Sequence, residues 1–416
     1  VMKIKLSSEW IYQLLFFVAV IFSYITNYEL SLLVWLVILM LTVKRFYSKS
    51  ILIYISLFVI ILAIGCIRSL YYDHSTYNIL RDISYFIKPI VGLLIGYQCF
   101  RTKENNFFRT IIYSAFGIAI YHFITLFIGS FYLPLNNLHD IRHIGGYFSD
   151  FETFAFVILL FHKKFELNFS QKKLWFFTGI IGLSLLLYFA RTNFIQLFIL
   201  ICGMFGLYQI TKKKLIILSS LLLIIGVGYK IVYDMNPTRN GKGLDAFLYK
   251  VKNAPTEIYD PYVVNDNSSR FHDNFRSFET KVTIAQVVNR GDYGVWLGNG
   301  FGSSVNYGSL MWTNDGNYIR HAPILHNGYS TIFLKTGIVG LSIFVFSMVY
   351  LSFVYKTSDI SLHNNIKLLV NSTGIFLFIS TLVFLGYYLK LDNKSLFVGG
   401  LIAYYEIITK TDKSIT

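Results

Sequence analysis

The sequence predicts an all-α polytopic membrane protein with about twelve transmembrane helices and one large polar loop. Of its 416 residues, 55% are hydrophobic and only 14% are charged, whereas soluble domains carry about 25% charged residues. Apolar runs of about 18 or more residues, the length that can cross a bilayer, fill most of the chain. The net charge of +15 is explained by the lysines and arginines that membrane proteins concentrate in cytoplasmic loops, so we expect no nucleic-acid partner.

Twelve apolar segments define the predicted spans, and a polar loop separates the ninth segment from the tenth. We expect about nine spans within residues 1–233 and about three within residues 327–416. The second and sixth segments are short for a hydrocarbon core of about 30 Å. The segments are residues 10–27, 29–43, 50–70, 83–100, 108–130, 146–162, 173–190, 192–210, 213–233, 327–355, 366–389 and 395–409.

The predicted orientation follows from the positive charges in alternate loops, because cytoplasmic loops are enriched in lysine and arginine. With the N-terminus inside, the cytoplasmic segments hold nineteen lysine and arginine side chains, and the opposite short loops hold five besides two near span ends. Both termini are then cytoplasmic, and the polar loop of residues 234–326 lies outside. The cytoplasmic segments in this layout are residues 1–9, 44–49, 101–109, 163–173, 211–214, 356–367 and 410–416.

The polar loop is expected to be partly helical. In "LDAFLYKVKN", the side chains of Leu244, Leu248 and Val251 share one face, which is typical of a helix lying in the headgroup layer. A second helix is expected from Ser269 to Val288, because phenylalanines recur there at helical spacing. The turn-rich sequence between the two helices predicts an irregular connection.

The second predicted helix also has a polar face. His272, Arg276, Glu279 and Thr283 recur at i, i+4, i+7 and i+11, so they lie on one side of a continuous helix. This face is either a solvated surface with an Arg–Glu pair or part of a binding site. The following "LGNGFGS", residues 297–303, supplies a flexible turn whose backbone can approach a ligand closely, but it lacks the Lys-Ser/Thr of a nucleotide-binding loop.

Four stretches on the predicted outer side resemble a known family when taken together and in this order. They are "RHIGGYFSDFETFAF", "LYFARTNFIQL", "FRSFETKVTIAQVV…LGNGFGS" and "LHNGYSTIFLKTGIVGL". The chain resembles the O-antigen polymerase and O-antigen ligase superfamily (Wzy-type and WaaL-type) over roughly residues 140–341. The resemblance implies a GT-C-like glycosyltransferase of the bacterial inner membrane, with a periplasmic active site that uses glycans carried on undecaprenyl diphosphate.

Three side chains are the catalytic candidates that the resemblance implies. The family's arginine after a short outer turn matches Arg191, and its loop arginine matches Arg276, with Arg270 as the rival. The family's histidine before a glycine-rich span matches His326, and Asn327 follows it. The family often has serine or threonine ahead of the first arginine, where this chain has Tyr-Phe-Ala, which puts a hydroxyl role there in doubt.

The chemistry of these residue types suits a lipid-diphosphate donor. Guanidinium groups bind phosphate oxygens in a bidentate manner and stay charged. An imidazole can take the proton of an attacking sugar hydroxyl, and the alternative role for His326 is a hydrogen bond to the diphosphate. The substrate-binding candidates are Arg270, Arg142, His143, Asn327 and Glu279, although Arg142 and His143 also fit a loop without such a role.

No metal and no cofactor are expected, because arginines alone can neutralise a diphosphate. The acidic pair Asp150 and Glu152 in "SDFET" is the alternative, since membrane glycosyltransferases of the oligosaccharyltransferase type use such pairs with a divalent ion. His321 and His326 have poor spacing for a shared metal ion.

The leading functional prediction is a polymerase that joins undecaprenyl-diphosphate-linked oligosaccharide repeat units into O-antigen or capsular polysaccharide. The alternative within the superfamily is a ligase that transfers lipid-linked glycan to lipid A core or to protein. A transporter or flippase and a structural assembly protein are the alternatives from other classes. The expected partners are the lipid-linked donor and acceptor, membrane lipids and a chain-length regulator.

Overall fold

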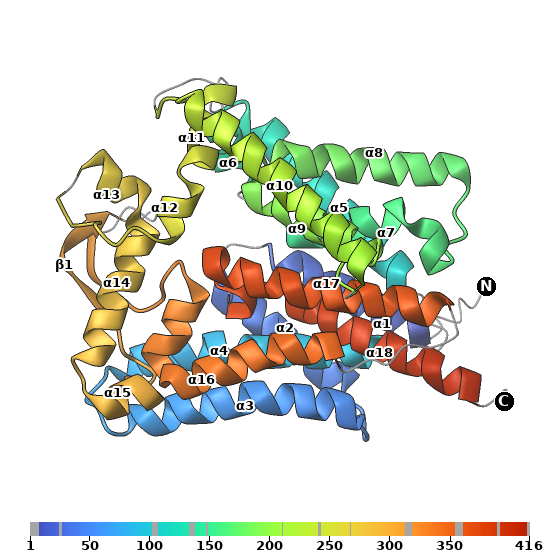
Figure 1. Ribbon diagram of the computed structural model, residues 1–416. Coiled ribbons are helices and arrows are strands. Elements are labelled where there is room, and N and C mark those ends of the chain that lie inside the picture. Colours follow the sequence, from blue (N-terminus) through green and yellow to red (C-terminus); the bar gives the residue numbers. More distant parts are fainter. Residues whose placement is uncertain are drawn as a thin grey trace.

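The computed structural model consists of helices that run side by side and of a group of smaller elements at one end (Figure 1). Five helices are long and apolar enough to cross a membrane, which fits the all-α membrane protein expected from the sequence. They are α3, α5, α10, α16 and α17. The structure describes residues 8–24, 27–101, 107–132, 138–146, 149–209, 211–239, 243–266, 268–312, 318–353, 361–388 and 392–413.

Each of the twelve apolar segments forms a helix, and polar side chains mark where several of these helices begin. Asn27, Ser48, Ser170 and Thr211 each accept a hydrogen bond from the backbone N–H three residues further along the chain, which satisfies a donor that the first helical turn leaves unpaired. The helices are α1 (Ser8–Phe22), α2 (Tyr28–Thr42), α3 (Lys49–Ser69), α4 (Thr76–Cys99), α5 (Phe107–Gly129), α7 (Asp150–Leu160), α8 (Gln171–Leu187), α9 (Arg191–Met204), α10 (Lys212–Asp234), α16 (Gly328–Phe353), α17 (Ser361–Phe384) and α18 (Lys394–Lys413).

The number of membrane crossings stays a prediction. Helix α7, in the sixth apolar segment, has 11 residues, whereas a crossing needs about 20. Three further short helices connect the longer ones. They are α6 (Leu138–Gly145), η1 (His162–Phe165) and η2 (Gly386–Tyr388).

The centre of the bundle is the contact between α4 and α18, where glycines allow the two backbones to approach closely. A Cβ atom built on Gly96 of α4 would lie 2.1 Å from the carbonyl oxygen of Leu396, and one on Gly399 of α18 would lie 2.1 Å from that of Leu93. No side chain fits at either position, so both helices depend on glycine for this packing. Small residues at helix interfaces serve the same purpose in membrane bundles generally.

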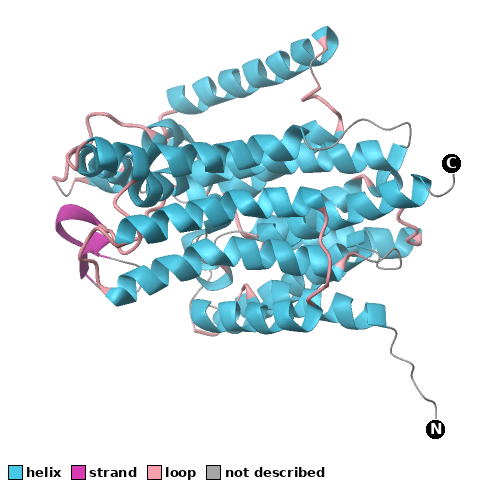
Figure 2. Cartoon of the chain, turned by 90° about the horizontal axis from the view of Figure 1, so that it is seen from below, coloured by secondary structure: helices cyan, strands magenta, loops and turns pink. Residues whose placement is uncertain are grey.

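The polar loop folds into short elements at the end of the bundle opposite to both chain termini (Figure 1). Two of these elements are antiparallel strands that pair Val305 with Ala322 and Trp312 with Tyr318 (Figure 2). This hairpin is absent from the sequence-based expectation. The elements are α11 (Leu244–Lys252), α12 (Ala254–Ile258), α13 (Ser269–Asp273), α14 (Phe275–Val288), α15 (Asp292–Leu297), β1 (Val305–Trp312) and β2 (Tyr318–Ala322).

The helix expected from Ser269 to Val288 is interrupted at Asn274, and the prediction of one continuous helix is wrong. Asn274 has φ −105° and ψ 22°, between α13 and α14. Its side-chain amide donates to Asp260 at 2.9 Å, which gives this amide a partner outside the helix. Because of the break, His272 does not continue the polar face that Arg276 and Glu279 share on α14.

The glycines of "LGNGFGS" bring the loop against a break in α16. Gly337 has φ 64° and ψ −162°, so the helical hydrogen bonding stops there. The backbone N–H groups of Asn299 and Gly300 donate to the carbonyls of Leu334 and Lys335 at 2.8 and 3.1 Å. A Cβ atom on Gly298 would lie 2.5 Å from the α16 backbone. The close backbone approach expected of these glycines is therefore made to another helix of the same chain.

A buried ion pair fixes the same loop to α4. Lys335 donates to Asp82 at 2.6 Å, and both side chains are almost completely buried. The second donor to Asp82 is the backbone N–H of Gly302 at 2.7 Å, and Lys335 also donates to the carbonyl of Ser303. Buried charges need such paired and hydrogen-bonded partners, so this pair joins α4, α16 and the glycine loop into one unit.

Helix α10 lies apart from the bundle. None of its described side chains is buried, and Figure 2 shows it separated from the neighbouring helices. It is held at its C-terminal end, where the Tyr229 hydroxyl donates to the carbonyl of Lys252 at 2.9 Å and the Lys252 amine donates to Asn236 at 2.5 Å. Through these contacts α10 is joined to α11.

Candidate functional site

His326 is held by a buried carboxylate on α14. The His326 ring donates from Nδ1 to Glu279 Oε2 at 2.8 Å, and the backbone N–H of His326 donates to the same oxygen at 3.1 Å. The Glu279 side chain is 1% exposed, whereas that of His326 is 56% exposed. The structure therefore fixes one edge of the imidazole in the protein and leaves the rest of the ring open to solvent.

Tyr307 of β1 completes the surroundings of Glu279. Its hydroxyl donates to Glu279 Oε1, and burial together with the adjacent carboxylate raises the pKa of Tyr307, so the hydroxyl keeps its proton. A carboxylate has only acceptor oxygens, so the contact with Glu279 assigns the donor role and a hydrogen to Nδ1 of His326. The other ring nitrogen, Nε2, then has its lone pair free to accept a proton.

Arg191 and Arg276 meet at one carboxylate, although they lie on different helices. Arg191 begins α9 and donates to Glu257 Oε2 at 2.8 Å, and Arg276 in the first turn of α14 donates to Glu257 Oε1 at 2.8 Å. All three side chains are partly buried. The structure thus brings together two arginines that the sequence analysis selected separately, with Glu257 of α12 between them.

Helix α14 links the two halves of this arrangement. Arg276 and Glu279 lie three residues apart, so they are neighbours on one helix face, and each charge acts on the other. Burial lowers the pKa of Arg276, and the Glu257 carboxylate opposes that effect. The guanidinium pair and the His326 imidazole therefore lie at one end of the bundle, around the first two turns of α14.

Further positive charge lies beside Arg191. The side chain of Arg191 also donates to the backbone carbonyl of Lys250. Burial lowers the pKa of the Lys250 amine, and the positive charges of Arg142 and Arg191 lower it further. Arg142 of α6, one of the substrate-binding candidates, thus belongs to the same group of cations. This concentration of positive charge favours an anionic ligand.

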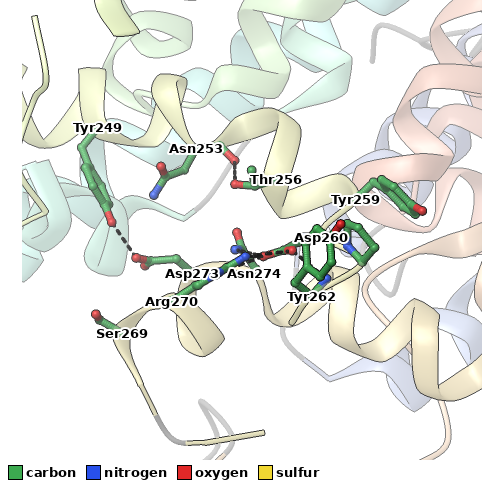
Figure 3. A pocket seen from close by; sticks show the side chains of 11 residues that line it. Tyr249, Asn253, Thr256, Tyr259, Asp260, Tyr262, Ser269, Arg270, Asp273 and Asn274 are labelled. Carbon is green, nitrogen blue, oxygen red and sulfur yellow. Dashed lines mark hydrogen bonds and ion pairs between the residues drawn. The ribbon is translucent and has the colours of Figure 1, made fainter. Parts of the chain in front are cut away.

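Arg270, the rival of Arg276, lies at a different place. It forms a bidentate contact with Asp260, from Nε at 3.1 Å and from Nη2 at 2.9 Å. Both residues line a hollow of about 530 Å³ between α11, α12 and α13 (Figure 3). Neither Arg191 nor Arg276 lines this hollow, so the two candidate arginines of the loop occupy separate sites.

Asn327 and His143 complete the list of candidates. The side-chain oxygen of Asn327 accepts from the backbone N–H groups of Tyr329 and Ser330 at 2.9 and 3.4 Å, which caps the start of α16. Asn327 therefore has a structural role that positions the residue before it. His143 falls within α6, but its side chain is outside the part of the chain that the structure describes.

The acidic pair in "SDFET" is buried inside the bundle. Asp150 accepts a hydrogen bond from Lys394 at 2.7 Å, and Lys394 also pairs with Asp392 at 3.2 Å. Glu152, two residues further along α7, is completely buried near the hydroxyls of Tyr24 and Tyr188. Within the described residues, no group of three or more His, Cys, Asp or Glu side chains is placed to hold a metal ion.

Two residues of the site were missed by sequence reasoning. Glu257 lies in "PTEIYD" and Tyr307 in "VNYGSL", and neither segment belongs to the four motif stretches. The alternation of apolar Val305 and Tyr307 with Asn306 and Gly308 is a short period-2 signal that could have indicated a strand with Tyr307 on its inner face. No comparable local signal marks Glu257, because its role depends on two arginines from other helices.

Neither the comparison with protein-family models nor the comparison with curated proteins finds a match for this chain. A functional assignment therefore depends on the geometry of the described residues and on the resemblance of the four motif stretches.

Proposed function

We propose that this protein is a bacterial inner-membrane glycosyltransferase that polymerises undecaprenyl-diphosphate-linked oligosaccharide repeat units into O-antigen or capsular polysaccharide on the periplasmic side. The observation that carries the proposal is the meeting at α14 of a carboxylate-oriented imidazole, His326, with a guanidinium pair, Arg191 and Arg276. A base held beside an anion-binding group is what transfer from a sugar diphosphate requires.

In this proposal His326 is the general base. A hydroxyl oxygen of the acceptor sugar attacks the anomeric carbon of the donor, and its proton passes to Nε2 of His326. The bond between the anomeric carbon and the diphosphate oxygen breaks, and undecaprenyl diphosphate leaves with the electron pair. Glu279 then faces an imidazolium, whose positive charge its carboxylate stabilises through the Nδ1 contact.

Arg191 and Arg276 stabilise the leaving diphosphate in the same proposal. Glu257 holds the two guanidinium groups at the two oxygens of one carboxylate, so both are positioned to meet an anion with several oxygens. Guanidinium groups suit this role because their planar donors match phosphate oxygens in pairs. Because two guanidinium groups can carry the charge of the leaving diphosphate, we expect transfer to proceed without a metal.

Variants of the three side chains test the proposal in cells. We expect His326→Ala to reduce transfer by roughly 10²–10⁴-fold, the range for loss of a general base. Arg191→Lys and Arg276→Lys should each lose about 10²–10³-fold, because lysine keeps the charge but loses the bidentate contact. The measurement is the ladder of polysaccharide chain lengths on gels, normalised to the amount of each variant in the membrane.

Arg270→Lys is the matched comparison for Arg276→Lys. We expect it to be milder, since Arg270 contacts Asp260 at the hollow and not Glu257. Normal ladders in both His326→Ala and Arg191→Lys would refute the proposed mechanism. If lipid-linked polymer accumulated at full length and only its transfer to lipid A core failed, the ligase alternative would replace the polymerase.

A further inference from the structure

The hollow between α11, α12 and α13 has the composition of a site for an uncharged, hydroxyl-rich ligand. Three tyrosines line it, together with amide, hydroxyl, carboxylate and guanidinium side chains. Among the described lining residues, none has an aliphatic side chain apart from a single proline, so the hollow does not suit an acyl or prenyl chain. The lining residues are Tyr249, Asn253, Thr256, Tyr259, Asp260, Pro261, Tyr262, Ser269, Arg270, Asp273 and Asn274.

The charges of the lining argue against a phosphate ligand. Two carboxylates, Asp260 and Asp273, are present with one guanidinium, Arg270. Both carboxylates are already held. Asp260 accepts from Arg270 and Asn274, and Asp273 accepts from Tyr249 at 2.7 Å (Figure 3) and from Arg239 at 3.1 Å. Arg239 pairs with Asp273 from outside the lining, so the two carboxylates offset two guanidinium groups. A phosphate would therefore meet no net positive charge here, whereas the arginine pair at Glu257 offers it one.

Two of the tyrosines present open aromatic faces. Tyr259 is 71% exposed and Tyr262 is 78% exposed, and both lie at the same side of the hollow in Figure 3. Arg270 is 63% exposed and uses Nε and Nη2 for Asp260, which leaves its Nη1 donors for a ligand. Flat apolar rings beside fixed donors and acceptors match a sugar ring, which has apolar C–H faces and polar hydroxyl edges.

The hollow is connected to the catalytic candidates through α12 and α14. Thr256 lines the hollow, and the next residue, Glu257, contacts Arg191 and Arg276. On the other side, the backbone N–H of Asp260 donates to the hydroxyl of Ser277 at 2.6 Å, and Ser277 follows Arg276 on α14. A glycan bound in the hollow would therefore lie beside the group that holds the diphosphate.

We propose that this hollow is a carbohydrate subsite and that it holds the acceptor glycan of the transfer reaction. The second part rests on the proposed function, whereas sugar binding by the hollow does not. The hollow is assigned to the acceptor because the donor carries a diphosphate, which the arginine pair binds better than the hollow does. Tyr259 and Tyr262 carry the stacking contacts, and Arg270 carries the polar contact that fixes the orientation of the sugar.

Direct binding tests the subsite on the purified full-length protein in lipid nanodiscs. The probe is the reducing oligosaccharide that mild acid releases from the lipid-linked repeat units of cells that carry the gene. The oligosaccharide is titrated against the protein, and saturation-transfer NMR detects the bound sugar. We expect this measurement to show binding to the wild-type protein. The double variant Tyr259→Ala/Tyr262→Ala should weaken binding at least about tenfold, since each aromatic contact contributes to affinity.

Tyr293→Ala is the matched control, because Tyr293 of α15 is 77% exposed in the same loop but does not line the hollow. We expect it to bind like the wild type, and we expect His326→Ala to keep full oligosaccharide binding while losing transfer. In transfer assays, the double tyrosine variant should show a raised KM for acceptor and a largely unchanged kcat.

Three results would overturn the inference. They are no binding to the wild type, equal binding by the double tyrosine variant and Tyr293→Ala, or competitive displacement of the oligosaccharide by inorganic pyrophosphate. A failure of the proposed function looks different. In that case the wild type would transfer no sugar, yet the oligosaccharide would still bind and the tyrosine variants would still weaken its binding.

Discussion

Two glutamates hold the basic side chains of the candidate site in place. Glu279 is a buried carboxylate with three donors, two of them from His326, and Glu257 joins two arginines. Removing a partner from a buried, charged hydrogen bond costs about 1.5–3 kcal/mol. We therefore infer that each glutamate sets the position and orientation of the groups that meet the substrate, without contacting the reacting atoms itself.

Glu279→Gln tests this positioning role. The amide keeps the size of the side chain but removes the negative charge that faces His326, so an imidazolium formed during transfer loses its stabilising partner. We expect kcat to fall by about 10²–10⁴-fold, with KM for the lipid-linked donor little changed, because the arginine pair is intact. Steady-state kinetics of the purified protein would measure both values. A raised KM with normal kcat would instead place Glu279 in donor binding.

At this scale the sequence predicts only part of the site. Arg191, Arg276 and His326 could be selected because they stand in motif stretches with a characteristic order. Glu257 could not, since its significance arises only when α9 and α14 place their arginines on either side of it. The polar face of α14 was visible in the sequence, but the choice between a solvated surface and a buried acceptor for Glu279 depends on Tyr307, which a distant strand supplies.

Among the elements, the glycine loop of residues 297–303 and the broken helix α16 stabilise each other. The break at Gly337 leaves the carbonyls of Leu334 and Lys335 without helical partners, and backbone N–H groups of the loop donate hydrogen bonds to them. His326 lies directly before the same helix, and Asn327 caps it. The position of the imidazole therefore depends on how this helix is anchored.

Gly298→Ala should disturb this anchoring. Gly298 has φ +72°, and an added Cβ would lie 2.5 Å from the backbone of Lys335 and Thr336, which cannot move without shifting α16. Gly291→Ala is the matched control, since Gly291 has φ +79° and nothing within 4 Å of an added Cβ. Both variants carry the backbone strain of roughly 1–3 kcal/mol. We expect Gly298→Ala to lower the free energy of unfolding by about 1–3 kcal/mol more than Gly291→Ala does, because the added Cβ overpacks the contact with α16.

The thermal unfolding midpoint of the purified variants measures the difference. A clearly lower midpoint for Gly298→Ala than for Gly291→Ala supports the close contact between the loop and α16. Equal midpoints would show that the loop is not packed against the helix backbone in this way.

The elements themselves are predictable to different degrees. The apolar segments all form helices because continuous hydrophobicity leaves few alternatives in a membrane environment. The break at Asn274 was not predicted, because the phenylalanine spacing continues across it and the interruption depends on a contact with Asp260. The segment around Val305 and Ala322 is rich in polar residues and glycine, so the short alternation at Val305 and Tyr307 is a weak signal for these strands.

For the whole molecule, the position of the loop relative to the two chain termini bears on the predicted orientation in the membrane. The loop elements from α11 to β2 lie at one end of the bundle, and both termini lie at the other (Figure 1). This agrees with the alternation of positive charges along the sequence, which places the termini and the lysine-rich loops on one side. Arg276 and His326, the two catalytic candidates in the loop, lie at the same end of the bundle as these elements.

Cysteine labelling tests this orientation. Tyr262 lies in the loop and is 78% exposed. We therefore expect Tyr262→Cys to react with an impermeant thiol reagent in intact spheroplasts. Lys172→Cys, in a segment expected to be cytoplasmic, should react only after lysis. The three native cysteines, Cys66, Cys99 and Cys202, would be replaced by serine beforehand. If Lys172→Cys reacted in intact spheroplasts and Tyr262→Cys did not, the topology would be the reverse of the predicted one. The proposed function would then be contradicted.

The separation of α10 from the bundle links the candidate site to the thickness of the membrane. With 23 residues, α10 is about 34 Å long at 1.5 Å per residue, slightly more than a hydrocarbon core of about 30 Å. None of its described side chains is buried against the bundle, so we expect its tilt to follow the match between its length and the bilayer. Its C-terminal end is joined to α11, whose Lys250 carbonyl accepts a hydrogen bond from Arg191. We therefore expect a thinner or thicker bilayer to shift the arginine pair through this helix.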